Sequence, residues 1–209
     1  HRRDHHLECG HDWNHPCIMA WVPLNESWGV PDVANNSMQQ NFTARMAQLT
    51  RSLDPTRPVV DNSGWCHVDT DIVDIHPYTG DPVELAAMIE QMLRTGEPGH
   101  SYPAPVWVGG AKDGGQPIVV SEYGGIALDA DVEPEKGNEG GWGYGHAAQT
   151  PEDLLRRFAE LTKAIIQNKE VAGYVYTQLT DVEQEKNGLL KFDRQPKAPI
   201  EAIAAAQKD

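Results

Sequence analysis

The sequence predicts an α/β fold built on a parallel sheet, and two patterns lead to this prediction. Short apolar runs rich in Val and Ile alternate along the 209 residues with longer amphipathic stretches. Each run is bounded by turn-forming residues, which is typical of strands buried on both faces of a parallel sheet. The repeated strand–helix–strand order also implies right-handed crossovers, which place successive strands parallel to one another.

Five apolar runs are the predicted strands, namely Cys17–Leu24, Pro58–Val60, Ile72–Ile75, Pro117–Val120 and Gly173–Leu179. Four amphipathic stretches are the predicted helices, namely Val33–Leu53, Pro82–Arg94, Pro151–Asn168 and Pro199–Gln207. The third helix has the clearest start, because Thr150 can cap it and Pro151 suits its first turn. The segments Gly96–Gln116 and Ala127–Thr150 are predicted as long loops, with Gly137–Gly145 as a mobile active-site loop.

This order of elements fits two architectures, an open doubly wound sheet and a (β/α)8 barrel. A nucleotide-binding open sheet is disfavoured, because no glycine-rich phosphate loop follows the first predicted strand. A whole barrel needs eight strands, roughly three more than the sequence predicts. The pattern of elements alone leaves both architectures open.

The composition excludes several classes of partner. The formal net charge of −14 argues against nucleic acid and against an anionic membrane surface, and no apolar run approaches the length of a membrane span. The 3 cysteines lack the spacing of a disulfide framework, which favours free thiols in a reducing compartment. We expect a cytoplasmic location in a bacterium. The chain opens on H-R-R-D-H-H without Met or a signal peptide, so we expect a piece of a longer polypeptide.

Two glutamates stand where chemistry is expected in such a fold. Glu26 ends one apolar run, in W-V-P-L-N-E-S-W-G, and Glu122 ends another, in P-I-V-V-S-E-Y-G-G. Side chains at the carboxyl ends of parallel strands line the active sites of α/β folds. Glycoside hydrolysis uses such a pair of carboxyl groups, about 5–5.5 Å apart in retaining enzymes and about 6.5–9.5 Å apart in inverting ones. The pair therefore favours a glycosidase.

Several segments resemble glycoside hydrolase family 2, and they follow the family's order. The Glu26 segment, with its lead-in D-W-N-H-P-C-I, resembles the acid/base segment on barrel strand four. D-I-V-D-I-H-P-Y resembles strand six, and the Glu122 segment resembles the nucleophile segment on strand seven. G-Y-V-Y-T-Q-L-T-D and N-G-L-L-K-F-D-R-Q-P-K resemble strand eight and the closing segment. The resemblance implies that residues 1–209 are the C-terminal portion of a (β/α)8 TIM barrel, about strands 4 to 8.

The resemblance also implies roles for single residues. Glu26 is then the acid/base and Glu122 the nucleophile of a retaining, β-galactosidase-like enzyme that needs no metal or other cofactor. Asn25 is expected to bond the sugar 2-hydroxyl, and Tyr78 to donate to the Glu122 carboxylate. His76 lies two residues before Tyr78, on the same strand face, and is expected at the substrate. Three aromatic residues are candidate sugar platforms, namely Trp28, Trp65 and Trp142.

The chain departs from the family pattern at three points. Thr177 occupies the position of the usual strand-eight Trp, so the floor of the sugar site is expected to differ. Glucuronate-binding members carry an Asn-x-Lys element, whereas here Lys186 precedes Asn187, which disfavours β-glucuronidase specificity without excluding it. The upstream β-sandwich domains, the first barrel strands and a supporting Arg have no counterpart. We therefore expect this chain to associate with the missing N-terminal part of the same protein, or to form an oligomer. Alone, it is expected to have little or no activity.

Three rival interpretations remain at this stage. A metal protein is suggested by seven potential ligands near the start of the chain, His1, His5, His6, Cys9, His11, His15 and Cys17, although their spacing matches no strong zinc pattern. A non-catalytic carbohydrate-binding barrel would keep the aromatic residues, but the presence of both glutamates favours an enzyme. An inverting hydrolase would use the same two residues.

Overall fold

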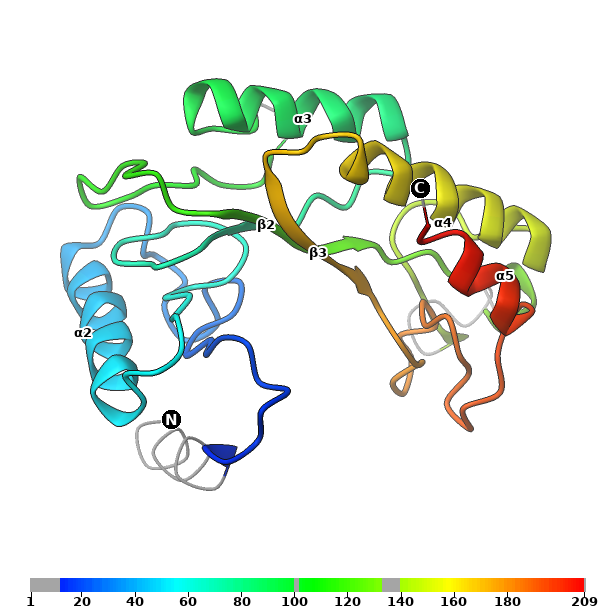
Figure 1. The fold of residues 1–209 in the computed structure, drawn as a ribbon, viewed down its shortest axis with the longest axis horizontal. Coiled ribbons are helices and arrows are strands. Elements are labelled where there is room, and N and C mark those ends of the chain that lie inside the picture. Colours follow the sequence, from blue (N-terminus) through cyan, green and yellow to red (C-terminus); the bar gives the residue numbers. More distant parts are fainter. Residues whose placement is uncertain (1–11, 100–101, 133–139, 209) are drawn as a thin grey trace. The chain divides into compact units, whose positions relative to one another are not determined.

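A computed structural model describes residues 12–99, 102–132 and 140–208 (Figure 1). The chain divides into two compact units, one formed by residues 1–76 and 92–119 and the other by residues 77–91 and 120–209. Each unit is described by itself. Within the described residues, no helix combines the length and apolar character that crossing a membrane requires.

The first unit contains parallel backbone segments that follow two of the predicted strands. Single parallel bridges join Trp21 to Val59 and Asn25 to Ser63. The ladder between these bridges is interrupted, and Pro23 explains the interruption because proline has no N–H to donate. The runs Cys17–Leu24 and Pro58–Val60 are therefore paired neighbours, as expected, but they are too irregular to form full strands.

Strand β1 spans Val73–Ile75, and strand β2 spans Ile118–Gly124. In the first unit, the Val73 N–H donates to the Pro117 carbonyl at 3.0 Å, so β1 lies beside the start of β2. The predicted loop Gly96–Gln116 also takes part in pairing, because His67 forms a parallel bridge with Trp107. Helix α2, Ser37–Leu53, is capped by Asn36 and starts later than predicted. Near its end Arg51 donates to Asp69 and Asp71, just before β1.

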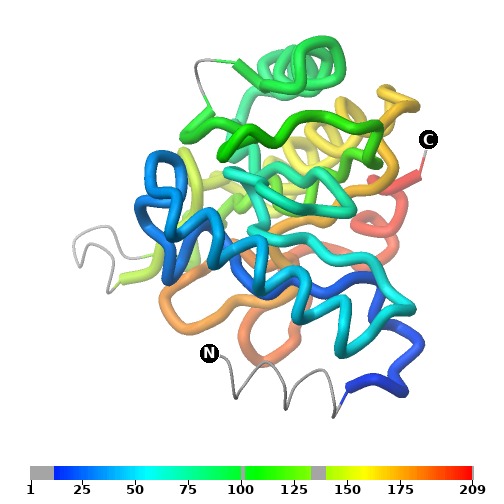
Figure 2. Tube along the Cα trace, turned by 90° about the vertical axis from the view of Figure 1, so that its left-hand side faces the viewer, coloured from blue at the N-terminus to red at the C-terminus, as the bar shows by residue number. Residues whose placement is uncertain are grey.

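The second unit pairs β2 with strand β3, Val171–Thr177, so that β2 is the middle strand in the order β1-β2-β3. The connections between these strands contain helix α3, Pro82–Thr95, and helix α4, Pro151–Ile166. Helix-containing crossovers are what parallel neighbours require. Helix α5, Ile200–Ala205, packs its Ile203 into the same apolar cluster as Phe158 of α4, and the two helices lie close together in both views (Figures 1 and 2).

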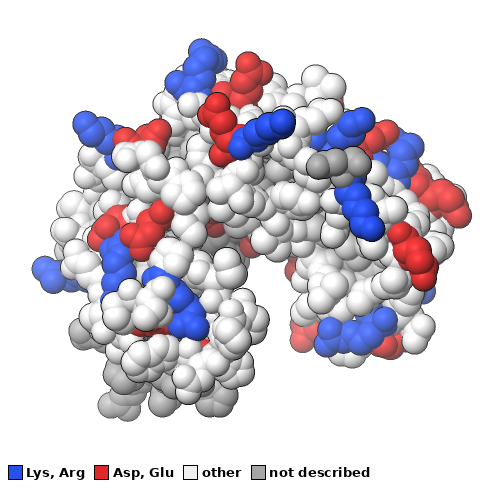
Figure 3. Space-filling model, viewed as in Figure 1, with Lys and Arg blue, Asp and Glu red and all other residues white. Residues whose placement is uncertain are grey.

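The predictions for α3, α4 and α5 are confirmed to within a few residues at each end. Thr150 caps α4 as expected, since its side chain accepts from the Asp153 N–H, and Pro151 follows in the first turn. On the face of α4 that meets solvent, Arg156 pairs with Asp153 and Glu160. Acidic and basic side chains are interspersed in this way across the face drawn in Figure 3. The part of the predicted mobile loop at 137–139 lies outside the described residues.

Candidate active site

Glu26 lies in the first unit, directly after the segment that is bridged to Ser63. Its backbone N–H donates to the Ser63 carbonyl at 2.9 Å. Glu26 and Ser27 both adopt left-handed backbone conformations, with φ of 49° and 61°. Such conformations cost free energy for residues other than glycine and persist where the surroundings enforce them. They turn the Glu26 side chain away from the strand direction, and that side chain is 22% exposed.

Asn62 enforces this conformation by binding Ser27 at two points. Its Oδ1 accepts from the Ser27 N–H at 2.9 Å, and its Nδ2 donates to the Ser27 Oγ at 3.1 Å. The same Nδ2 donates to the Trp65 carbonyl at 2.6 Å, and the Trp65 indole N–H donates to the Ser27 Oγ at 3.2 Å. Because Asn62 is fully buried, the turn that carries Glu26 is fixed from inside the unit.

His76 supports the Glu26 carboxyl group directly. A 2.9 Å hydrogen bond joins Nδ1 of His76 to Oε1 of Glu26, and a 3.0 Å bond joins Nε2 to the Ser63 hydroxyl. The His76 side chain has no exposed surface, and its backbone N–H donates to the Tyr102 hydroxyl at 2.7 Å. Gly64 leaves room for the ring, since a Cβ at that position would lie 2.7 Å from Nδ1. The structure therefore assigns His76 a supporting contact to Glu26.

The bonding pattern defines which nitrogen of neutral His76 carries the proton. The Ser63 hydroxyl has one proton and donates it to the Asp74 carboxylate. Its oxygen must then accept from Nε2–H of His76, which leaves Nδ1 without a proton in the neutral ring. A neutral His76 in this tautomer can therefore bond Glu26 only by accepting a hydrogen bond from the Glu26 carboxyl group.

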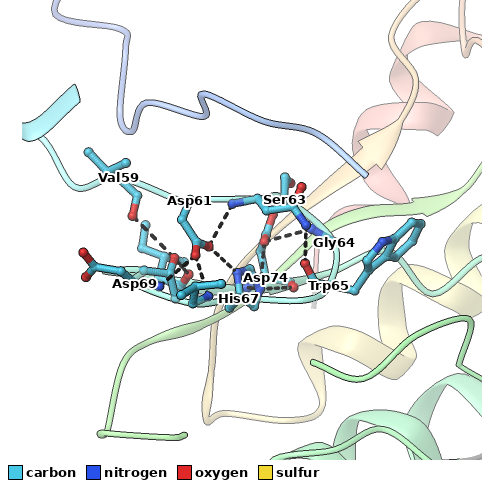
Figure 4. Close-up of polar contacts among 12 residues, drawn as sticks. Val59, Asp61, Ser63, Gly64, Trp65, His67, Asp69 and Asp74 are labelled. Carbon is cyan, nitrogen blue, oxygen red and sulfur yellow. Dashed lines mark hydrogen bonds and ion pairs between the residues drawn. The ribbon is translucent and has the colours of Figure 1, made fainter. Parts of the chain in front are cut away.

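A buried cluster of charged groups lies behind this chain of bonds (Figure 4). His67 bonds the Asp61 carboxylate through Nδ1 at 2.8 Å and the Asp74 carbonyl through Nε2 at 3.0 Å. Burial alone would raise the pKa of Asp61, but the hydrogen bond and charge of His67 hold it below its usual range. Burial alone would lower the pKa of His67, but Asp61 and Asp74 raise it. The cluster thus favours a charged pair beside Asn62 and Ser63.

Glu122 lies in the second unit, on strand β2. The Tyr78 hydroxyl donates to the Glu122 carboxylate, and Oγ1 of Thr177 lies 3.2 Å from the same hydroxyl oxygen. Burial, reinforced by the bond to Glu122, raises the pKa of Tyr78 well above its usual value. Tyr78 therefore stays a neutral donor, and a donor of this kind favours the ionised form of the carboxylate. Thr177 contributes to this support.

An aromatic stack holds Tyr78 in place. Tyr144 lies parallel to Tyr78 with ring centroids 3.5 Å apart, and Trp142 meets Tyr144 edge to face at 5.5 Å. Gly125 allows the close approach, because a Cβ there would lie 2.4 Å from the Tyr144 ring. The Trp142 backbone is itself bonded to Gln184 and Lys186. The described part of the predicted mobile loop is therefore anchored, and Trp142 belongs to the surroundings of Tyr78.

The remaining predicted residues fall into groups. Asn25 is exposed, and Trp28 and Trp65 line a pocket together with Glu26. Asn187, considered above for glucuronate binding, is fully buried, with its amide bonded to Gln178 at 2.8 Å and to Glu185 at 3.0 Å. Of the potential metal ligands at the start of the chain, His15 and Cys17 are exposed, and the other five lie outside the described residues.

Sequence reasoning missed several residues that support the two glutamates. These are Asn62, Ser63, Asp74, Tyr102 and Tyr144. The polar triplet D-N-S at 61–63 follows a buried apolar run, and this position at a strand end was the available signal. Tyr102 and Tyr144 stand in segments predicted as loops, where nothing in the sequence indicates their partners.

Three solved structures are similar to this chain in fold. A β-galacturonidase from Eisenbergiella tayi, solved with galacturonate, is 19% identical with a TM-score of 0.64, over 94% of this chain and 34% of its own. A β-glucuronidase from an uncultured Clostridium species is 21% identical with a TM-score of 0.62, over 98% and 35%. A β-glucuronidase from Bacteroides uniformis is 16% identical with a TM-score of 0.66, over 98% and 25%. The chain thus spans about a third of the first two structures.

These likenesses show that the fold is that of an α/β TIM barrel, of which the described sheet is a part. The family model of the TIM barrel domain of glycosyl hydrolases family 2 matches residues 6–208, nearly the whole chain. This chain therefore belongs to glycosyl hydrolase family 2, within its TIM barrel domain.

Proposed function

We propose that this chain supplies both catalytic carboxyl groups of a retaining β-glycosidase. Glu26 acts as acid/base and Glu122 as nucleophile. The observation that carries the proposal is the contrast between their partners. Tyr78 donates to Glu122, which suits an ionised nucleophile, whereas neutral His76 protonated on Nε2 can only accept from Glu26, which suits a protonated acid. A pair of carboxyl groups with opposite protonation states is what double displacement requires.

The two steps follow from these states. In the first, the Glu122 carboxylate attacks the anomeric carbon while the glycosidic bond breaks and Glu26 gives its proton to the leaving oxygen. Glu122 becomes a glycosyl ester and Glu26 is left ionised. In the second, Glu26 takes a proton from water as the water oxygen attacks the anomeric carbon and the ester bond breaks. Asn25, Trp65 and Trp142 are proposed to bind the sugar, and Trp28 the part of the substrate beyond the scissile bond.

The substrate class has two candidates. The sequence resemblance favours a neutral, β-galactosidase-like sugar, and the buried amide of Asn187 is already bonded to protein groups. The similar structures named above are a β-galacturonidase and β-glucuronidases, which supports a uronic acid as the second candidate. Turnover of 4-nitrophenyl β-galactoside against 4-nitrophenyl β-glucuronide decides between them, because the two substrates share their leaving group.

This chain matches only about a third of the length of two similar structures, which supports the proposal that it is part of a longer polypeptide. We propose that this chain forms about barrel strands 4 to 8 and that an N-terminal part supplies the other strands and the β-sandwich domains. The isolated chain is then expected to be inactive, and full turnover by residues 1–209 alone would contradict this.

Glu122→Gln in the complete polypeptide tests the enzymatic role against that of a non-catalytic binding protein. The variant should lose at least about 1,000-fold in kcat, because the nucleophile is removed, and should still bind the sugar product. Glu84→Gln, an exposed glutamate at the start of α3, is the matched control. Unchanged hydrolysis by the Glu122 variant would remove this residue from the mechanism. Product analysis by NMR, which distinguishes retention from inversion, tests the stereochemical course.

A further inference from the structure

A pocket of about 660 Å3 lies beside Glu26 within the first unit. Glu26 and Ser27 form its polar side. The rest of its lining is mainly apolar and includes Trp28, Pro31, Val33, Ala34, Trp65 and Ala104. A volume of this size lies in the range of sites for small organic ligands, roughly 300–1,000 Å3. The proposed mechanism does not state which part of a ligand occupies this space.

Two indole rings, those of Trp28 and Trp65, form the aromatic part of the pocket lining. Trp65 is held in place, since it meets His76 edge to face at 5.9 Å and Tyr102 at 6.3 Å, and its N–H donates to Ser27. Trp28 is 75% exposed and presents its ring to solvent. A rigid indole on one wall and an accessible indole on another suit a flat apolar ligand, because aromatic faces bind flat rings by stacking.

The charges of the lining residues indicate which ligands the pocket favours. Burial raises the pKa of the Cys66 thiol to about 11, with further contributions from Glu97 and Asp61, so this lining residue stays neutral at neutral pH. Glu26 is then the one carboxyl group among the lining residues. Because nothing in the lining offers a positive charge, the pocket favours an uncharged ligand over an anionic one.

We propose that this pocket binds the leaving group of the substrate, and that the leaving group is a neutral, planar aromatic alcohol stacked on Trp28. This inference rests on the proposed role of Glu26 as general acid. A general acid lies within hydrogen-bond reach of the oxygen it protonates. The group bonded to that oxygen therefore lies next to Glu26, where the described residues provide the apolar pocket.

Steady-state kinetics of the complete polypeptide test the proposal. All substrates carry the same sugar, namely the one whose 4-nitrophenyl glycoside is hydrolysed fastest. Trp28→Ala should lower kcat/KM for the 2-naphthyl glycoside about tenfold and for the methyl glycoside less than about twofold. Comparing each substrate between wild type and variant cancels the intrinsic difference in leaving-group reactivity. Trp28→Phe should keep most of the activity, and Trp13→Ala, which removes a half-exposed indole outside the pocket, should change neither substrate. Equal losses on both substrates, or no loss, would overturn the proposal.

A binding experiment separates failure of this inference from failure of the proposed function. With indole nitrogens labelled by 15N, titration with 2-naphthol should shift the Trp28 N–H resonance in an NMR spectrum, and Trp28→Ala should weaken binding about tenfold. If no β-glycoside is hydrolysed but 2-naphthol shifts Trp28, the pocket binds aromatic alcohols and the catalytic proposal fails. If glycosides are hydrolysed but 2-naphthol does not shift Trp28, the leaving-group site is refuted and the glycosidase proposal stands.

Discussion

His76 bonds the Glu26 carboxyl group through a 2.9 Å contact between Nδ1 and Oε1, across 50 residues of sequence. The opposite ring nitrogen bonds Ser63, whose hydroxyl donates to Asp74. This chain of bonds places the proton of neutral His76 on Nε2. Nδ1 of that tautomer can then only accept a hydrogen bond from Glu26. Glu26, the proposed general acid, is thus supported by a chain of bonds through His76 and Ser63 to Asp74.

Ser63→Ala tests this chain of bonds. Without the Ser63 oxygen, Nε2–H of His76 loses its 3.0 Å hydrogen bond, and the ring can place its proton on Nδ1 and stabilise ionised Glu26 instead. We expect kcat/KM for methyl glycosides, which need protonation of the leaving oxygen, to fall about tenfold or more. The 2,4-dinitrophenyl glycoside, whose leaving group needs little protonation, should change less than about twofold.

The exposed Ser52 on α2 provides the control, and Ser52→Ala should leave both rates unchanged. The direction of this effect is opposite to that predicted for Trp28→Ala, which spares the methyl glycoside. A uniform loss across all leaving groups in Ser63→Ala would show that Ser63 acts only on folding.

Gly64→Ala tests whether the position of His76 matters. A Cβ at Gly64 would lie 2.7 Å from the His76 Nδ1, the atom that bonds Glu26, so the ring is expected to shift. The backbone φ of +100° adds strain on the order of 1–3 kcal/mol for any other residue. We expect the same selective loss on methyl glycosides as in Ser63→Ala, together with lower thermal stability.

Gly110→Ala separates these two effects. Gly110 has a φ of +84°, and a Cβ there would have no atom within 4 Å, so this substitution adds strain alone. Both variants should lose similar stability in thermal unfolding, while Gly64→Ala alone changes the leaving-group dependence. Identical kinetics in the two variants would contradict the role of His76.

Tyr78→Phe removes the donor that supports the Glu122 carboxylate. A carboxylate that loses a hydrogen-bond donor is less oriented and less readily kept ionised, and we expect kcat to fall about 100-fold. The control is Tyr123→Phe, at the neighbouring position to Glu122, whose buried hydroxyl bonds Thr162 at 2.7 Å. That variant should cost about 1 kcal/mol of stability and leave kcat within about twofold. Equal kcat values for the two variants would refute the role of Tyr78.

The buried pair of Asp61 and His67 predicts how the stability of the first unit depends on pH. The pKa of His67 is raised, so its contribution is complete below the ordinary value of 6.5 and is lost as the pH rises through the folded pKa. The pKa of Asp61 is lowered, so its contribution is complete above 3.8 and is lost as the pH falls through the folded pKa. Stability should therefore be greatest between these ordinary values.

Urea unfolding of wild type, Asp61→Asn and His67→Gln from pH 3 to 9 measures this dependence. Breaking a buried pair lowers the free energy of unfolding by about 3–5 kcal/mol. In each variant, the decrease in stability with pH that the substituted residue causes should also be absent. The fall above pH 6.5 should thus be absent in His67→Gln. An unchanged pH dependence in that variant would show that His67 is not charged in the folded protein.

Much of this account was accessible from the sequence, because periodic patterns report local structure. The helix at Pro151–Ile166 followed from its cap, its proline and its apolar stripe. The choice of Glu26 and Glu122 rested on the ends of two apolar runs, but β2 extends beyond the predicted strand to Gly124 and contains Glu122. The support of Glu26 was not accessible, since it depends on positive φ values at Glu26 and Ser27 and on a contact to His76. No local pattern encodes these features, because residues brought together by the backbone path produce them.

Covalent trapping of the nucleophile tests the central claim most directly. The complete polypeptide would be incubated with a 2-deoxy-2-fluoro glycosyl fluoride of its preferred sugar, digested with protease and analysed by mass spectrometry. A glycosyl group attached to the peptide that contains Glu122, lost in Glu122→Gln, is the predicted result. Attachment to any other residue, or retained hydrolysis with no covalent adduct in active enzyme, would contradict the account.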